Sequence, residues 1–402
     1  MLNQLEKRLV LRPGREKSLR RRHWWIFSGA VREVTGEPAV GDVVEVYSSG
    51  GEWLARAGFS PASQLQARIW TFDRSEAVDD DFFRRRLLRA IAYRRALSFN
   101  RPTDGYRLVA SEADALPGLI VDRYADWLVV QFLSAGMEPF RRRLVDLLLE
   151  LLPEIRGIYD RSDVGVRAKE ALPETTGVLA GATVPEQVVI TENNLRFAVD
   201  IRHGHKSGFY FDQRCNRQAV AEAAKGAEML NLFAYTGGFG VAAAAAGAAF
   251  VTNVDSSAPA LALAERNFAL NGIPADRYEN IVDDVFELLR RCRRQKRQFD
   301  LIVLDPPKFV DSQKALARGC RAYKDVALQS FHLLKPGGRL FTFSCSGLMT
   351  PELFQKITAD AALDAGIEGV IVRRLGQAPD HPTALNQPEG FYLKGLEVYR
   401  TR

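Results

Sequence analysis

The order of apolar and polar positions divides the chain into three regions. In the first, residues 1–73, short alternating runs at residues 43–47 and 53–56 are separated by the turn-forming residues 48–51. A period of two with frequent turns is typical of short β-strands. We therefore predict a small β-rich domain at residues 1–73.

The second region, residues 74–190, mixes longer helical patterns with strand-like runs. Residues 79–99 have a helical pattern with acids at its start and arginines along its length, an order that suits the helix dipole. Two apolar runs then meet at the tight turn Ala125-Asp126. The other predicted elements are a helix at 138–152 and strands at 119–124, 127–133, 157–161, 188–191 and 196–199. This pattern predicts an α+β domain that serves as a scaffold or as a wall of a substrate cleft.

From about residue 200, short apolar strands alternate with helices. The predicted strands are 228–233, 250–255, 299–304 and 338–344, and the predicted helices are 238–246, 259–271, 285–291 and 323–334. Such alternation predicts a parallel, doubly wound sheet with its ligand site at the carboxyl ends of the strands. We therefore expect an α/β fold with a Rossmann-like domain at residues 191–402.

Composition adds a hint about the partner. The 402 residues are 47% apolar and 26% charged, as in an ordinary globular protein, and the net charge is +6. The first 35 residues hold nine Lys or Arg against three Glu, and Arg22 stands close to Trp24 and Trp25. Basic residues beside aromatic rings could hold phosphates and stack a base. The alternative is a solvated turn followed by core aromatics.

The sequence also bears on compartment and metals. The first residues contain no uninterrupted apolar core of the secretory type, and no apolar stretch approaches the ~20 residues that a membrane-spanning helix needs. Cys215, Cys292, Cys320 and Cys345 are far apart and form no zinc-binding pattern. We expect a cytoplasmic protein with no membrane segment and no metal.

A candidate cofactor loop follows the strand at residues 228–233. The run from Phe233 through Tyr235 to Gly237 and Gly238 is glycine-rich and leads into an alanine-rich helix. Glycines let the backbone approach a ligand closely, although the loop does not match the dinucleotide pattern G-x-G-x-x-G. Asp255 lies about 20 residues on, at the end of the next predicted strand, where a carboxylate can accept hydrogen bonds from ribose hydroxyls. These features fit either NAD or S-adenosylmethionine.

Two later segments favour S-adenosylmethionine. Asp284 follows the third strand and is placed to accept a hydrogen bond from an adenine amino group. The predicted strand at residues 299–304, the fourth of the expected sheet, leads into Asp305-Pro306-Pro307-Lys308-Phe309. Methyltransferases that act on nucleobases commonly carry an Asp-Pro-Pro-aromatic run, whereas NAD enzymes do not. The prolines stiffen the backbone and remove donors, so that Asp305 and a carbonyl can point at the base.

Cys345 is the candidate nucleophile because it follows the fifth strand, beside Asp305 in this topology. The C5 carbon of cytosine becomes nucleophilic only after a thiolate adds to C6. Asp305 is then the candidate group that assists at N3. Methylation of an exocyclic amine needs no cysteine, so Cys345 favours carbon methylation.

Together these residues resemble the bacterial 23S ribosomal RNA cytosine-C5 methyltransferases of the RlmI type, over essentially the whole chain. The motifs that carry the resemblance are the runs at residues 204–214, 283–286, 304–309, 343–349, 380–382 and 388–390. The resemblance implies an N-terminal PUA domain (1–73), a central strand-strand-helix-strand-strand domain (74–190) and a class I methyltransferase domain (191–402). The chain departs from the family pattern at Ser207, where threonine is usual, and at Trp24, where proline is frequent.

The family pattern implies roles for individual residues. It makes Cys345 the nucleophile, for which the chemistry above adds Asp305 as the catalytic partner. It places S-adenosylmethionine near Gln213, Arg214, Phe233, Tyr235, Gly237, Asp255, Asp284 and Asp305. Substrate contacts are expected at Pro306, Pro307, Lys308, Phe309, Arg22 and Trp24.

The expected partner is 23S ribosomal RNA, and the family allows a homodimer. One alternative is methylation of an exocyclic amine on guanine N2 or adenine N6. Another is a non-catalytic ribosome-assembly factor that binds RNA. A dense basic cluster at residues 290–297 could bind RNA, but it precedes the fourth strand, so we expect it at the edge of the sheet away from the cofactor.

Overall fold

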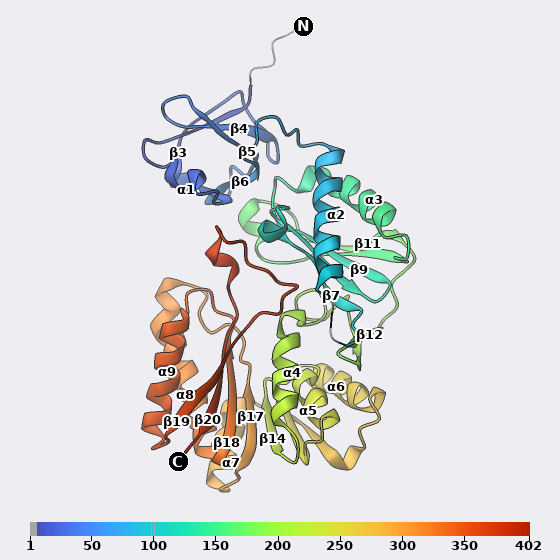
Figure 1. Ribbon diagram of the computed structural model, residues 1–402, viewed down its shortest axis with the longest axis vertical. Helices are drawn as coiled ribbons and strands as arrows, with labels where there is room; N and C mark the ends of the chain where they lie inside the picture. Colours follow the sequence, from blue (N-terminus) through green and yellow to red (C-terminus); the bar gives the residue numbers. More distant parts are fainter. Residues whose placement is uncertain (1–5, 98, 100) are drawn as a thin grey trace.

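The computed structural model describes residues 6–97, 99 and 101–402, and the strands in this part of the chain form four sheets. Figure 1 shows three bodies along the long axis, with the N-terminal sheet at one end and the largest sheet at the other. The strands of the two N-terminal bodies are β1 (Arg8–Leu11), β2 (Trp25–Phe27), β3 (Val31–Thr35), β4 (Val43–Tyr47), β5 (Trp53–Phe59), β6 (Leu65–Thr71), β7 (Gly105–Ala110), β8 (Leu119–Tyr124), β9 (Trp127–Phe132), β10 (Gly157–Ser162) and β11 (Thr175–Gly181). Their helices are α1 (Lys17–Arg20), α2 (Asp80–Ala96) and α3 (Arg141–Leu151).

The third body contains the remaining elements. Its strands are β12 (Val188–Glu192), β13 (Leu195–Val199), β14 (Glu228–Leu232), β15 (Phe250–Asp255), β16 (Tyr278–Val282), β17 (Phe299–Leu304), β18 (Leu334–Ser344), β19 (Gly369–Gly376) and β20 (Lys394–Arg400). Its helices are α4 (Arg214–Ala223), α5 (Gly238–Ala245), α6 (Ala258–Leu270), α7 (Val285–Arg294), α8 (Leu316–Leu333) and α9 (Pro351–Asp364).

The N-terminal body is a six-stranded sheet in the order β2-β6-β5-β4-β1-β3, which confirms the β-rich prediction. Alternate residues of each strand face inward, so that Val44 and Val46 of β4 are fully buried and the residues between them are not. Leu9, Ala57 and Ile69 complete one apolar core from neighbouring strands.

The central body is a five-stranded sheet in the order β11-β10-β9-β8-β7, packed against α2 and α3. The predicted hairpin is present, and β8 and β9 pair in antiparallel register around Ala125, which has a left-handed φ of 55°. The side chain of Asp79 caps α2 by accepting a hydrogen bond from the Phe82 amide. The helix ends at Ala96, three residues before the predicted end, and position 98 lies outside the described residues.

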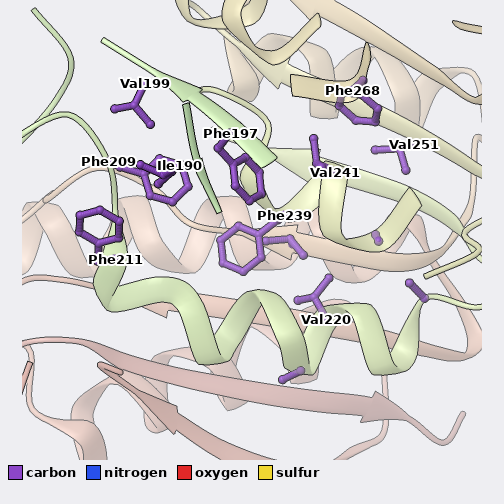
Figure 2. Packing of buried hydrophobic residues seen from close by; sticks show 14 of the residues in the cluster. Ile190, Phe197, Val199, Phe209, Phe211, Val220, Phe239, Val241, Val251 and Phe268 are labelled. Atoms are coloured by element: carbon purple, nitrogen blue, oxygen red, sulfur yellow. The ribbon is translucent and has the colours of Figure 1, made fainter. Parts of the chain in front are cut away.

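The strands predicted at 188–191 and 196–199 do not join the central sheet. They are β12 and β13, which form a separate two-stranded hairpin. Phe197 of this hairpin packs with Phe239 and Phe268 in the core beneath the largest sheet (Figure 2). The predicted domain boundary at residue 190 therefore falls inside β12. The division at 73 and 190 stays a prediction.

The largest sheet has seven strands in the order β16-β15-β14-β17-β18-β20-β19. The first five are parallel and β20 runs antiparallel between β18 and β19. Neighbouring residues of β14 enter different cores. Met229 packs with the α4–α6 side and Leu230 with the α7–α9 side, so both faces are covered. This confirms the doubly wound sheet. Helix α8 starts at Leu316, seven residues before the predicted start.

A long connection between β19 and β20, residues 377–393, leaves the largest sheet and reaches the other two bodies (Figure 1). The Trp24 amide donates to Gln387 Oε1 at 3.2 Å, and the Tyr93 hydroxyl donates to the Pro379 carbonyl at 3.0 Å. We call this segment the connecting loop. Among the described residues, no helix combines the length and apolar character required to cross a membrane. The same residues contain no group of three or more His, Cys, Asp or Glu arranged to hold a metal ion.

Candidate functional site

The loop between β14 and α5 has a strained backbone. Phe233 and Tyr235 have φ of 58° and 49°, a left-handed conformation that costs a non-glycine residue on the order of 1–2 kcal/mol. Gly237 has φ of 75°, and a Cβ there would lie 2.9 Å from the Ala264 Cβ. The amide of Tyr235 donates to Asp255 Oδ2 at 2.8 Å, which holds the loop against the end of β15. Such strain persists where the surroundings fix a backbone for a ligand.

Carboxylates follow successive parallel strands at this edge of the sheet. Asp255 ends β15, and Asp284 comes two residues after β16. Asp284 is exposed and caps α7 by accepting a hydrogen bond from the Glu287 amide at 3.0 Å. A close backbone approach with ribose and adenine acceptors on the neighbouring strands fits a nucleoside cofactor. The structure therefore brings Phe233, Tyr235 and Gly237 to the edge of the sheet that Asp255 and Asp284 occupy.

Asp305 and Cys345 follow neighbouring strands. Leu304 of β17 is paired with Thr342 of β18, so both strands deliver their next residues to the same edge. Gln213, which is buried, donates from Nε2 to Asp305 Oδ2 at 2.9 Å. The predicted pair of Cys345 and Asp305 is thus assembled, with Gln213 beside it.

A second carboxylate, Asp212, adds to the effect of burial on the charge of Asp305. Burial, and then the negative charge of Asp212, raise the pKa of Asp305 to about 7. Burial also opposes ionisation of Asp212, but Lys206 Nζ lies 2.5 Å from its Oδ2 and the Tyr392 hydroxyl donates to the same oxygen at 2.8 Å. These contacts hold the pKa of Asp212 well below its usual range. One carboxyl of the pair is therefore fixed as an anion, and the other takes up a proton near neutral pH.

Cys345 lies in the same electrostatic environment. Burial, and then the charge of Asp305, raise the pKa of its thiol, while the cation of Lys206 acts in the opposite direction. The other free cysteines are an exposed Cys215, a buried Cys292 and a half-buried Cys320, and none of them belongs to this cluster.

The residues of the proline run differ in exposure. Pro306 is buried, whereas Pro307 and Lys308 are exposed. Phe309 is half-buried, and its ring packs against Tyr323 with centroids 4.9 Å apart. A base could reach Pro307 and Lys308 directly, whereas the Phe309 ring already contacts the α7–α8 side of the core. Base contacts at these four residues stay predictions.

Arg214 is neither free nor part of a surface pair. Its guanidinium donates to both oxygens of Asp380, at 2.7 and 3.1 Å, and both side chains are buried. Asp380 also accepts a hydrogen bond from the Arg107 amide at 2.9 Å, and its carbonyl accepts one from Arg94 at 2.9 Å. Arg214 therefore ties α4 to the connecting loop and the central sheet. A contact between Arg214 and the cofactor stays a prediction.

Arg22 and Trp24 lie where the N-terminal body meets the connecting loop. The Arg22 guanidinium stacks over Phe72, 4.9 Å from the ring centroid, and its carbonyl accepts a hydrogen bond from Asn386. The Trp24 ring is half-buried and packs against the N-terminal core. The structure does not bring these two residues to Cys345, and their RNA contact stays a prediction.

Two further aromatic residues lie near this junction: Trp25, which belongs to the basic and aromatic segment noted in the sequence, and Phe27, for which the sequence offers no signal. Trp25 donates from Nε1 to Glu112 at 2.8 Å, and Phe27, on the same face of β2, is 51% exposed. Trp25, Glu112, His381 and Tyr392 help to line a cavity of about 210 Å³ between the three bodies. Because the Tyr392 hydroxyl also donates to Asp212, this cavity adjoins the cluster of Asp212, Asp305 and Cys345.

The basic cluster at residues 290–297 lies away from the site. It forms the end of α7, just before the amino end of β17, while the site is at the carboxyl end of that strand. Arg290, Arg291 and Arg297 form ion pairs with Glu287, Asp283 and Glu279. Three of the six basic residues in this cluster are thus ion-paired, and the cluster lies at the opposite end of β17 from the site, as expected from the sequence.

Known proteins match this sequence and fold. A family model described as S-adenosylmethionine-dependent methyltransferase matches residues 168–391, and one described as PUA-like domain matches residues 9–72. Proteins called ribosomal RNA large subunit methyltransferase I are similar over almost their whole length. The one from Shewanella amazonensis is 52% identical over 389 residues (97% of this chain and 98% of that protein), and the one from Aeromonas salmonicida is 54% identical over 390 residues (97% and 98%).

Solved structures show the same fold. A structure from Streptococcus mutans, described as a candidate S-adenosylmethionine-dependent methyltransferase, matches with a TM-score of 0.85 and 23% identity, and the match covers 98% of this chain and 99% of that one. A candidate methyltransferase complexed with SAH matches with the same score, identity and coverage.

Proposed function

The chain belongs to the S-adenosylmethionine-dependent methyltransferase family that includes ribosomal RNA large subunit methyltransferase I, and we propose that it forms 5-methylcytosine in 23S ribosomal RNA through a covalent cysteine adduct. The observation that carries this proposal is the juxtaposition of Cys345 and Asp305 at the ends of β18 and β17. Methyl transfer to an exocyclic amine would leave a cysteine at this position without a use.

The proposed roles follow from the chemistry of cytosine. The Cys345 thiolate adds to C6 and forms a carbon–sulfur bond, which makes C5 nucleophilic. Asp305, protonated near neutral pH, donates its proton to N3 and so neutralises the charge that develops on the ring. After C5 has gained the methyl group, its proton passes to water, the carbon–sulfur bond breaks with release of the thiolate, and N3 returns its proton to Asp305.

The cofactor supplies the methyl group on a positively charged sulfur. We propose that Phe233, Tyr235 and Gly237 form its backbone cradle, with Asp255 at the ribose and Asp284 at the adenine. The observation behind this assignment is the strained loop, which Asp255 holds at the edge of the sheet by accepting a hydrogen bond from the Tyr235 amide.

The RNA is proposed to approach across the junction of the three bodies. A base inside a helix cannot reach Cys345, so the target cytosine would have to leave its stack. The cavity of about 210 Å³ beside Tyr392 offers a path from the N-terminal body to the catalytic cluster. Arg22 and Trp24 remain the proposed N-terminal contacts.

Replacement of the nucleophile tests the reaction. Cys345→Ala and, as a matched control, Cys320→Ala would be incubated with 23S ribosomal RNA and labelled S-adenosylmethionine. The proposal expects Cys345→Ala to lose 5-methylcytosine formation, measured by nucleoside mass spectrometry, and Cys320→Ala to retain it. Full activity of Cys345→Ala would exclude the covalent route, and a methylated guanine or adenine would instead favour amine chemistry.

A further inference from the structure

Lys394 is a buried lysine without an acidic partner. It is the first residue of β20, pairs with Ser344 in the sheet, and is 4% exposed. Its Nζ donates to the Ser346 carbonyl at 2.7 Å. No carboxylate of the described residues lies within ion-pair distance of it, although an ammonium group has three protons to donate.

Burial of such a group is costly. An unpaired ammonium in a low-dielectric site costs several kcal/mol unless an anion compensates it. Burial lowers the pKa of Lys394 to about 8, and the charge of Lys308 acts in the same direction. The interaction that favours its charged form is with Cys345. The anion that would compensate Lys394 is therefore the Cys345 thiolate.

Cys345 in turn needs a cation. Burial and the two carboxylates Asp305 and Asp212 raise the pKa of the thiol, so the site disfavours the form that attacks cytosine. Lys206 acts in the opposite direction, but Asp212 already holds its Nζ at 2.5 Å. The titratable and charged groups around Cys345 are Asp305, Asp212, Lys206, Tyr210, Tyr323 and Lys394.

We propose that Lys394 is a positioning residue that holds the Cys345-Ser346 turn through the Ser346 carbonyl and stabilises the Cys345 thiolate by its buried charge. This inference rests on the proposed function, in which the Cys345 thiolate adds to C6 of cytosine. The hydrogen bond holds the backbone next to Cys345, and the charge favours ionisation of the thiol. No bond is made to Lys394, and the thiol proton leaves to solvent.

The test measures the ionisation of Cys345 directly. Wild type, Lys394→Met and Lys394→Arg would be alkylated with iodoacetamide from pH 6.5 to 10, and modification of the Cys345 peptide would be followed by mass spectrometry. At a pH below the pKa of the thiol, an increase of 1 in that pKa lowers the thiolate fraction about tenfold. If the loss of the Lys394 charge raises the pKa of Cys345 by about 1, alkylation of Lys394→Met at pH 8 should be about tenfold slower than in wild type. Lys394→Arg keeps the charge and should restore most of the rate.

Two controls separate charge from folding. Exposed Cys215 reports general reactivity in the same chains, and Lys356→Met on α9 removes a lysine that is 70% exposed, is paired with Asp360 and is not among the groups that act on the Cys345 thiol. If Lys394→Met does not fold, Lys394→Gln keeps a donor for the Ser346 carbonyl without the charge and carries the same expectation. A Cys345 profile that superimposes on that of wild type in the folded variant would overturn the proposal.

Methyl transfer gives a second readout. The activity of the uncharged variant relative to wild type should rise from pH 7.5 to higher pH, where the thiolate forms without help. Ionisation of Asp305 lowers the activity of both proteins alike, and a merely structural role would not change their ratio. The alkylation assay needs neither RNA nor turnover. The proposal for Lys394 can therefore fail while Cys345→Ala still abolishes methylation. In the opposite case, Lys394 changes the alkylation of Cys345 although Cys345→Ala keeps full methylation.

Discussion

Asp305→Asn should stabilise the protein at alkaline pH while it abolishes methyl transfer. The carboxyl of Asp305 is held by the Gln213 amide near the anionic Asp212, and these surroundings raise its pKa to about 7. Asparagine has the same shape and can still accept the hydrogen bond from Gln213. The substitution therefore removes the buried negative charge and little else.

The magnitude follows from the pKa. A rise from 3.8 to about 7 means that the folded state disfavours the ionised carboxyl by about 4 kcal/mol. Between these two values the folded protein keeps a proton that the unfolded chain releases, so the free energy of unfolding falls as the pH rises through this window. Above pH 7 the full cost is present. Because the site can relax, we expect Asp305→Asn to be more stable than wild type by about 2–4 kcal/mol at pH 8, and by much less at pH 4.5.

Denaturant unfolding of both proteins at the two pH values measures this difference. Asp284→Asn is the matched control, since Asp284 is an exposed helix cap and asparagine caps equally well. The control should change stability little at either pH. The reasoning is refuted if Asp305→Asn gains no stability between pH 4.5 and 8 relative to wild type, because the buried charge would then carry no cost.

Two further substitutions test the loop and the ion pair. Gly237→Ala combines a φ of 75° with a Cβ placed 2.9 Å from that of Ala264, so it should lower stability by about 1–2 kcal/mol and weaken S-adenosylmethionine binding measured by calorimetry; unchanged affinity would remove Gly237 from the cofactor site. Asp380→Ala leaves the buried Arg214 without its partner and should cost about 3–5 kcal/mol in denaturant unfolding, whereas a loss under 1 kcal/mol would mean that solvent reaches the pair.

The edge of the sheet that carries the candidate site could be predicted because its signals in the sequence are local. Each strand of the doubly wound sheet is a short apolar run, and the residues after those runs reach the same edge whatever the loops do. For this reason Asp255, Asp284, Asp305 and Cys345 were placed together from the sequence alone. The predicted bounds of β15 and β17 agree with the structure to the residue.

The features of the site that the sequence does not reveal have a common physical cause, which is contact between residues far apart in the chain. The ion pair of Arg214 with Asp380, 166 residues away, is not visible in the sequence, and a contact of Arg214 with the cofactor stays a prediction. Lys394 begins an antiparallel strand inserted between β18 and β19, and a parallel alternation does not predict that strand. Asp212 belongs to a motif that was recognised, yet its effect on Asp305 depends on the contact with Lys206 and on burial, neither of which a sequence pattern displays.

The connecting loop links the proposed RNA-binding body to the residues around Asp305. At its start Asp380 holds Arg214, and near its end the Tyr392 hydroxyl donates to Asp212, whose charge adds to the effect of burial in raising the pKa of Asp305. Between these points Gln387 accepts a hydrogen bond from the Trp24 amide of the N-terminal body. One loop therefore contacts both the N-terminal body, through Gln387, and the site, through Tyr392. The Tyr392 hydrogen bond adds to the stronger effect of Lys206 in keeping the pKa of Asp212 low.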